Sequence, residues 1–469
     1  MGTASELGYA VLAGWFFLPS HHADFTDLGG WTRYSPVAAL GLVALLGCLF
    51  TLYFASVRLL EPFSRVNGPV QKRAALVVLG FAALFGITLA LMYPITAIDL
   101  FNYVFRSRIL THYGDNPLVV PPASYPADPF VRYTGGWAGW PTPYGPLWII
   151  ISAPATLISG DSWLLNLLSF KALALGFYLA DSLLVYCFLR RSAPSCALVG
   201  LTLFAWNPLV LFDGIGNGHN DLVMVFFVLL SLYLLDRGHL TLSVAALAGS
   251  VMVKYVTLLL VPIYVVYLWH RFPNWQGRLL FAVKSFGVVV AMAAILYAPF
   301  WHGTDTLRGA IGQGSIYISS VPTLLLIFLE GIGGPHARTI TTALTLAVFF
   351  LVYAAHWQRS QREPMDLVRG YFNVLYVYLL VAVTQMESWY VIWPVALGSL
   401  LSDRVIHERA MLFSATALAS VVAFAYVWPW THASFLTMNI IAVGILVGPL
   451  VALHIYRSPF ARPGKARQP

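Results

Sequence analysis

The segment from Tyr93 to Trp148 decides how the rest of this chain is interpreted. It opens with MYPITAIDLFNYVFRSRIL (Met92–Leu110), continues through YGDNP (Tyr113–Pro117) and closes with WPTPYGPLW (Trp140–Trp148). Asp99 is the only acidic residue of the opening stretch, and it stands where a long apolar run ends. Arginines and many aromatic residues follow it. Because long apolar runs also flank this loop, we expect the loop to lie at a membrane surface.

Composition indicates a polytopic membrane protein. Apolar residues make up 59% of the 469 residues and charged residues only 10%, against roughly 25% charged residues in soluble domains. Apolar runs near the ~20 residues that cross a bilayer recur along the chain. The net charge of +8 would suggest nucleic acid in a soluble protein. Here the basic residues lie between apolar runs, where they set topology, so we expect no nucleic-acid partner.

The hydropathy pattern predicts an all-α bundle of about 13–14 transmembrane helices. The expected spans are residues 7–20, 35–59, 74–93, 164–189, 195–212, 219–236, 240–253, 256–270, 278–299, 337–357, 367–386, 389–402, 409–427 and 434–456. Two further apolar stretches, 146–159 and 317–333, are ambiguous. We expect both to be re-entrant or interfacial, because nearly all basic residues then fall on one side, in accord with the positive-inside rule. Those residues are Arg65, Lys72, Arg73, Arg190, Arg191, Arg237, Arg271, Arg278, Arg359, Arg362, Arg404, Arg409 and the basic residues from Arg457 to Arg467.

This topology predicts one transmembrane domain over residues 1–456, with both termini cytoplasmic and a disordered basic cytoplasmic tail over residues 457–469. A large first outer loop, 94–163, would contain juxtamembrane helices, and a second outer loop would cover 300–336. The turn GIGNGHND (Gly214–Asp221), the pair Lys254–Tyr255 and MESWY (Met386–Tyr390) fall on the same face. The polar residues that most need explanation therefore converge on one surface.

Several short motifs follow Asp99 in order along the chain. They are GxNP (Gly114, Asn116, Pro117), TPYGPLW (Thr142–Trp148), NPLVLFDGIGNGHNDLVM (Asn207–Met224), VKYVTLLLVP (Val253–Pro262) and ESWYVIWPVAL (Glu387–Leu397). Over about residues 75–400 this order resembles the GT-C superfamily of polyprenyl-phosphate-sugar-dependent glycosyltransferases, and most of all its bacterial α-mannosyltransferases.

The resemblance implies that the domain is catalytic and lies in the cell membrane among its lipids. It implies transfer of a hexose, mannose in the first place, from a polyprenyl-phosphate-sugar co-substrate to a glycan or glycolipid acceptor on the outer face, with inversion at the anomeric carbon. The chain carries a single acid where the family pattern has a DD or DxD pair. We therefore assign no metal ligand, and the need for a divalent cation stays open.

Asp99 is the expected catalytic base, since transfer to a hydroxyl needs a group that accepts the acceptor's proton. Partial desolvation at the interface would raise its proton affinity into a useful range. The alternative is an acid that only marks the membrane boundary. The dipole disfavours an acid at a helix C-terminus, which argues against that alternative.

Five basic side chains are candidates for binding the donor phosphate: Arg106, Arg108, Lys171, His219 and Lys254. Arginine suits bidentate phosphate binding, but Arg106 and Arg108 point in nearly opposite directions on a helix, so we expect one in the site and the other at lipid headgroups. Lys171 lies deep in a span, and intramembrane charge indicates function by default. Its distance along the helix argues against pairing with Asp181. Lys254 could instead be an interfacial residue that extends to headgroups.

Further residues are expected to contact the sugar, the acceptor or the prenyl chain: Asn102, Tyr103, Asn116, Tyr144, Asn220, Asp221, Tyr255, Glu387, Trp389 and Tyr390. Two alternatives stay open for members of this set. Asn220 or Asp221 could simply cap the following helix, and the aromatic residues, together with Trp137, Trp140 and Trp148, could belong to an interfacial belt.

Two other classes of function also need consideration. A lipid-linked sugar flippase or other transporter would show repeated halves and paired broken helices near the midplane, whereas here the polar residues gather at one surface. A polyprenyl-linked glycan polymerase or ligase would be expected to use arginines in a large late outer loop. In this chain the large loop is early and carries an acid.

Overall fold

The computed structural model describes residues 1–22, 36–64, 68–357 and 363–457. Within these ranges the regular elements are helices and no strand forms, so the predicted all-α class is confirmed. The predicted disordered tail from residue 458 onward, and Arg65, Arg359 and Arg362 of the topology argument, lie outside the described residues.

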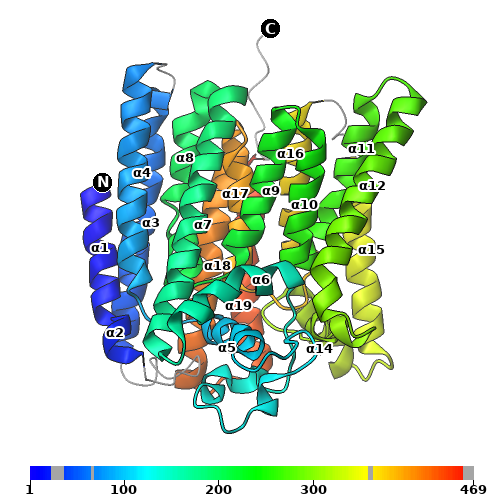
Figure 1. Cartoon of the computed structure of the whole chain (residues 1–469). Coiled ribbons are helices and arrows are strands. Elements are labelled where there is room, and N and C mark those ends of the chain that lie inside the picture. Colours follow the sequence, from blue (N-terminus) through cyan, green and yellow to red (C-terminus); the bar gives the residue numbers. More distant parts are fainter. Residues whose placement is uncertain (23–35, 65–67, 358–362, 458–469) are drawn as a thin grey trace.

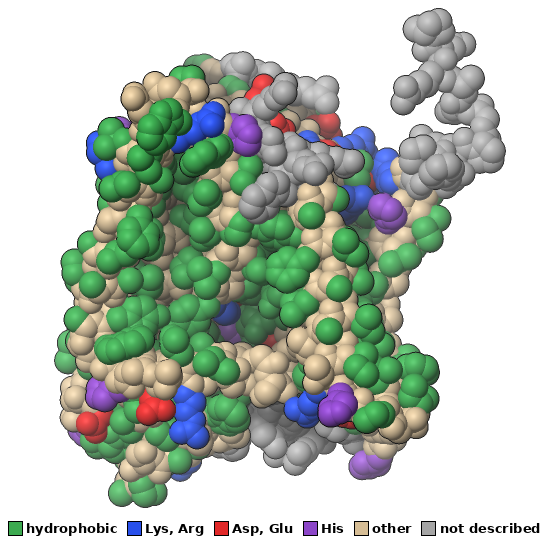
Figure 2. Space-filling model, turned by 90° about the vertical axis from the view of Figure 1, so that its right-hand side faces the viewer, with side chains coloured by type: hydrophobic (Ala, Val, Ile, Leu, Met, Phe, Trp, Pro, Cys, Tyr) green, Lys and Arg blue, Asp and Glu red, His purple; other side chains and the backbone are tan. Residues whose placement is uncertain are grey.

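Among the described residues eight helices are long and apolar enough to cross a membrane, which establishes a multi-pass membrane protein. A ninth span forms if α8 (Ala197–Ala205) and η4 (Val210–Gly216), bent by 52° at Asn207–Pro208, are counted as one. The eight are α3 (Pro36–Ser64), α4 (Pro69–Ala90), α7 (Trp163–Ser192), α12 (Trp275–Tyr297), α15 (Ala337–Trp357), α16 (Pro364–Val377) continued by η8 (Tyr378–Ala382), α18 (Arg404–Thr431) and α19 (Phe435–Arg457). Figure 2 shows apolar side chains across the middle of one face and charged side chains toward its two ends.

The other five expected spans are shorter helices, so full-length spans are fewer than the sequence suggests. They are α1 (Gly2–Trp15), α9 (Asp221–Asp236), α10 (Leu240–Val253), η5 with α11 (Tyr255–Leu260, Val261–Arg271), and η9 with α17 (Ser388–Val391, Ile392–Ser399). The chain leaves the helix at Lys254, whose backbone is extended. Hydropathy does not detect such a break inside an apolar run.

The loop predicted over residues 94–163 lies at the lower end of the bundle in the view of Figure 1. It contains α5 (Asp99–Thr111), α6 (Pro146–Ser159), η1 (Pro122–Ser124) and η2 (Val131–Trp137), which confirms that the loop is itself helical. The two ambiguous stretches form α6, of 14 residues, and α14 (Val321–Gly331), of 11 residues. Both are shorter than the ~20 residues of a full span.

Asp99 does not end a helix, and that part of the sequence interpretation was wrong. Helix α4 ends at Ala90, residues 91–98 are irregular, and Asp99 is the first residue of α5. Pro94 explains the interruption, because proline lacks the backbone N–H that a continuing helix would need. At a helix N-terminus the dipole favours a carboxylate, so α5 stabilises the charged form of Asp99.

Candidate active site

A cavity of about 260 Å³ opens where the first outer loop meets the end of the bundle. This volume is near the lower end of the ~300–1,000 Å³ of small-ligand sites. Its polar lining comes from Asp99, Asn102, Arg106, Tyr144, Gln313, Gln385 and Glu387, and its aromatic lining from Trp137, Trp140, Trp389 and Tyr390. Seven of the predicted site residues therefore line one cavity: Asp99, Asn102, Arg106, Tyr144, Glu387, Trp389 and Tyr390.

One face of α5 forms the first wall of the cavity. Asp99 and Arg106 are seven residues apart, which is close to two helical turns, so their side chains project from the same side. Arg108, two residues further on, projects from the opposite side. That opposite side of α5 is fastened to α6, since the hydroxyls of Ser107 and Thr111 both bond to Thr156.

Asp99 sits among hydroxyl groups and positive charge. The Tyr144 hydroxyl donates to Asp99 Oδ1 over 3.2 Å, and Tyr103 lies behind Tyr144 at an O···O distance of 3.3 Å. Burial raises the pKa of the Asp99 carboxyl, while Lys254, the Tyr144 hydrogen bond and Arg106 act in the opposite direction. Burial and the charge of Asp99 also raise the pKa of Tyr144, so the tyrosine keeps its proton and remains the donor.

Arg106 brings unused hydrogen-bond donors to the cavity. Its side chain is buried, with 5% of the residue exposed, and Nη2 donates to the Trp140 carbonyl over 3.4 Å. Nε has no hydrogen-bond partner among the described residues. Burial lowers the pKa of the guanidinium, partly offset by Tyr144 and Asp99. Because a buried cation with unpaired donors is costly, an anionic group is the expected occupant beside it.

The second wall comes from elements far along the chain. Gln313 ends α13 (Arg308–Gln313), and Gln385 and Glu387 belong to the segment before η9. Gln313 donates to Gln385 over 2.8 Å, and Gln385 donates to Glu387 over 2.7 Å. The sequence interpretation included Glu387 but missed both glutamines, since neutral amides carry no motif. Their only signal was position, in the second outer loop and two residues before Glu387.

Close backbone packing holds α13 against the first loop. A Cβ at Gly309 would overlap the carbonyl oxygen of Thr142, and one at Gly312 would overlap the Trp140 ring. Gly145 approaches the Met252 carbonyl equally closely, and its N–H bonds to Val253 over 3.1 Å. Glycine is needed where two backbones approach this closely. The TPYG turn is therefore fixed between α13 and α10.

A layer of polar residues lies directly behind the lining. Lys254 forms an ion pair with Asp221 at 2.8 Å and faces the Tyr390 ring at 4.9 Å, and the Trp393 Nε1 donates to Asp221 over 2.5 Å. Tyr103 donates to Asn220 over 3.2 Å. These residues do not line the cavity themselves, and they approach it only through their contacts with Tyr144 and Tyr390, which do. Their positions therefore do not support the predicted direct contacts with substrate.

His219 also belongs to this second layer. Its ring stacks on Trp389, which does line the cavity, with centroids 3.9 Å apart and planes inclined by 17°. Both ring nitrogens are buried and have no hydrogen-bond partner among the described residues. The geometry therefore supports positioning of Trp389 by His219, and it does not support the predicted direct phosphate contact.

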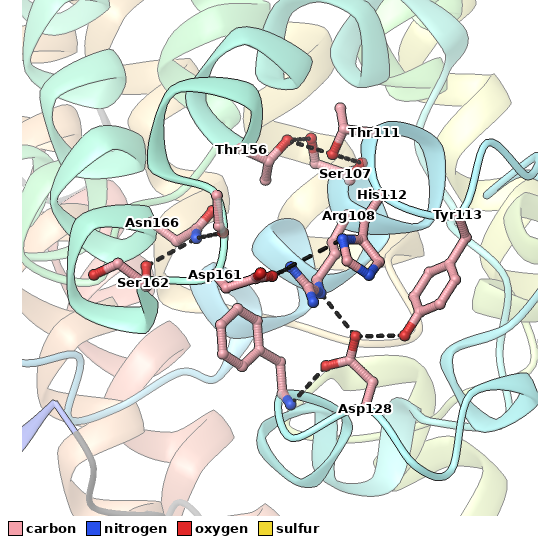
Figure 3. A network of polar contacts seen from close by, with 12 residues as sticks. Ser107, Arg108, Thr111, His112, Tyr113, Asp128, Thr156, Asp161, Ser162 and Asn166 are labelled. Carbon is pink, nitrogen blue, oxygen red and sulfur yellow. Dashed lines mark hydrogen bonds and ion pairs between the residues drawn. The ribbon is translucent and has the colours of Figure 1, made fainter.

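Arg108 lies outside the cavity, in a network of its own. Figure 3 shows its guanidinium between Asp128 and Asp161, each at 2.7 Å, with Tyr113 donating to Asp128. Carboxylates within the protein pair with this arginine and it does not line the cavity, so its position supports neither the predicted phosphate contact nor the headgroup alternative. These ion pairs tie α5 to the rest of the loop.

Three further candidates have structural contacts instead of a place in the cavity. Lys171 is fully buried, and its ammonium donates to the carbonyls of Met92, at 2.5 Å, and Gly216. Asn116 binds the Phe300 carbonyl at 2.7 Å and so joins the two outer loops. Tyr255 bonds to the Tyr297 hydroxyl at 2.8 Å. The predicted ligand roles of Lys171, Asn116 and Tyr255 find no support in these positions.

The described residues contain no group of three or more His, Cys, Asp or Glu side chains placed to hold a metal ion. Asp221, the acid behind Asp99, is occupied by Lys254 and Trp393. The donor set therefore does not fit a site with three protein ligands, and no step below uses a metal.

Comparison with known proteins identifies the family. A sequence model described as alpha-(1->6)-mannopyranosyltransferase, N-terminal domain, matches residues 1–271. The chain belongs to this family. The match contains the whole α5 wall of the cavity and ends before the second wall begins.

Two curated relatives carry the name alpha-(1->6)-mannopyranosyltransferase A. The protein from Mycobacterium tuberculosis is 24% identical over 336 residues, which cover 67% of this chain and 63% of the relative. The protein from Corynebacterium glutamicum is 26% identical over 180 residues, or 38% of this chain and 36% of the relative. The matches thus span less than two thirds of the length of these relatives.

Proposed function

We propose that this protein is a GT-C-type glycosyltransferase that moves mannose from a polyprenyl-phosphate donor to a glycan or glycolipid acceptor at the outer face of the cell membrane. The family and its mannosyltransferase relatives support the sugar and, through their names, an α-(1→6) linkage. The single observation that carries the chemistry is the placement of Asp99 and Arg106 on one face of α5, lining one cavity.

The transfer is a single displacement at the anomeric carbon. The acceptor hydroxyl oxygen forms a bond to this carbon while Asp99 takes the hydroxyl proton. The bond from the anomeric carbon to the phosphate oxygen breaks, and its electron pair leaves with the polyprenyl phosphate. Arg106 stabilises the charge that develops on this leaving group. Attack from the side opposite the phosphate inverts the configuration, so a β-linked donor gives an α-mannoside.

Release of free polyprenyl phosphate tests this proposal. The protein is reconstituted in vesicles with radiolabelled polyprenyl-phosphate mannose and a crude glycolipid acceptor. We expect the label to move to the acceptor and unlabelled polyprenyl phosphate to accumulate in equal amount. Donors that carry glucose or arabinose serve as the comparison for sugar preference. If the label crosses the bilayer still attached to its lipid, the protein is a flippase and the proposal is wrong.

The outer location of the site is tested separately by cysteine labelling in whole cells. Cys48, Cys187 and Cys196 are first replaced by alanine, and single cysteines are then introduced at exposed positions. We expect Ala127→Cys and Thr304→Cys to react with an impermeant thiol reagent, and Ser192→Cys at the other end of the bundle to react only after permeabilisation. Reaction of the Ser192 variant in intact cells would place the cavity on the cytoplasmic side.

A further inference from the structure

The side chains of Gln313, Gln385 and Glu387, called the amide wall below, form a series of hydrogen bonds with a defined direction. Gln385 Nε2 donates to Glu387 Oε1 over 2.7 Å. The side-chain carbonyl of Gln385 faces Gln313 and accepts from its Nε2. Each amide therefore donates toward the carboxyl group of Glu387.

Each end of this hydrogen-bonded series has an oxygen atom that can bond to a ligand. Among the described residues no hydrogen bond reaches the side-chain Oε1 of Gln313 or the Oε2 of Glu387. Both residues line the cavity. The wall therefore offers two hydrogen-bonding atoms, one at each end, opposite the face of α5 that carries Asp99 and Arg106.

Glu387 holds a proton at neutral pH. The charged groups around it are Asp99 and Arg106 of α5, Asp213 of η4 and Lys254 at the end of α10. Burial raises the pKa of Glu387 to about 8, and Asp99 and Asp213 add to this shift, while Gln385 and Lys254 oppose it. Because Oε1 accepts from Gln385, the proton sits on the other oxygen. Below about pH 8 that oxygen is a hydrogen-bond donor.

We infer that the Gln313–Gln385–Glu387 chain recognises the hexose by its hydroxyl groups, with Glu387 donating to one sugar oxygen and the Gln313 carbonyl accepting from another hydroxyl. This inference rests on the proposed mannosyl transfer and makes Glu387 a specificity-determining residue for it. A site built to hydrogen-bond a hydroxyl discriminates strongly against an analogue that lacks one, because its polar groups are then left unpaired. The neighbouring Trp389 provides an apolar surface on the same wall.

The first test is the dependence of kcat/KM on pH in the reconstituted protein. For the wild type we expect activity to fall as pH rises through about 8, where Glu387 loses its donor proton. Glu387→Gln keeps a donor that does not titrate, so its alkaline fall should disappear while activity at pH 7 stays high. Glu387→Met has no donor and should be roughly 10- to 100-fold less active than the wild type below about pH 8, and the difference should shrink at higher pH. Glu330→Gln, at an exposed acid of α14, is the folding control.

The second test identifies the sugar oxygen with monodeoxy mannosyl donors. We expect the wild type to have a much lower kcat/KM for one of the deoxy donors than for mannose. For that donor, Glu387→Met should lower kcat/KM little further. Two changes that remove the same hydrogen bond are not additive. An alkaline limb unchanged in Glu387→Gln, or full additivity for every deoxy donor, would overturn the inference and leave mannosyl transfer intact. A wild-type protein that transfers no mannose would overturn both.

Discussion

Asp99→Asn is expected to abolish transfer in a protein that still folds and still binds the donor. The asparagine carbonyl can accept the Tyr144 hydrogen bond as Asp99 Oδ1 does, so the α5 wall should keep its geometry. What disappears is the proton acceptor, and loss of a positioned base typically lowers the rate ~10²- to 10⁴-fold. The measurement is initial rate and donor affinity for the purified wild type and variant side by side.

The matched control for this substitution is Asp305→Asn, an exposed acid on the second outer loop away from the cavity lining. It should retain nearly wild-type rates. An Asp99→Asn protein with more than about a tenth of wild-type activity would exclude Asp99 as the base.

Replacement of Arg106 should lower the rate of transfer almost as much as replacement of Asp99, mainly through a lower kcat. Arg106 is the basic residue among the described side chains that line the cavity, and its Nε has no other partner there. Removal of one donor that stabilises developing charge typically lowers kcat ~10²- to 10³-fold. Because the charge on the phosphate grows as the bond to the sugar breaks, Arg106→Gln should reduce kcat more than donor affinity.

Arg132→Gln provides the comparison for Arg106→Gln. Arg132 is an exposed arginine of the same loop that donates to the Tyr133 hydroxyl and lies over its ring, and surface substitutions of this kind change stability by about 0.5 kcal/mol or less. Equal losses in the two variants, or a loss of affinity alone for Arg106→Gln, would show that Arg106 does not act on the leaving group.

Local rules were enough to bring together the α5 residues that line the cavity. Asp99 is the one acid in an apolar stretch, and the helical period separates Arg106 from Arg108 before any coordinates are known. Tyr144 belongs to the TPYGPLW motif (Thr142–Trp148) noted in the sequence. The membrane class likewise follows from composition and needs no tertiary information.

The errors arose where the partner of a buried group is distant in the chain. Arg108 is satisfied by Asp128 and Asp161, and Lys171 by the carbonyls of Met92 and Gly216. Spacing along a helix does not reveal such partners, so each cation seemed to need a ligand. The helices that are too short for spans have the same origin, since their ends are set by packing and backbone breaks inside apolar runs.

The two glutamines of the second wall could not be predicted, because Gln313 and Gln385 meet only after α13 has docked on the first loop. That docking depends on the close approach of Gly309 to the Thr142 backbone. A glycine inside a short helix gives no indication in the sequence of which backbone it will approach.

The two walls of the cavity are assigned different roles, and they come from different parts of the sequence. Every atom assigned to proton removal or to the leaving group lies before residue 271, in the part shared with the family, whereas the amide wall lies wholly after it. Substitutions in the later half can therefore retune which monosaccharide is accepted without disturbing the reacting atoms. On this assignment the reaction and its selectivity can change separately, while the close approach of Gly309 to Thr142 and the hydrogen bond from Asn116 to Phe300 keep the two loops in contact.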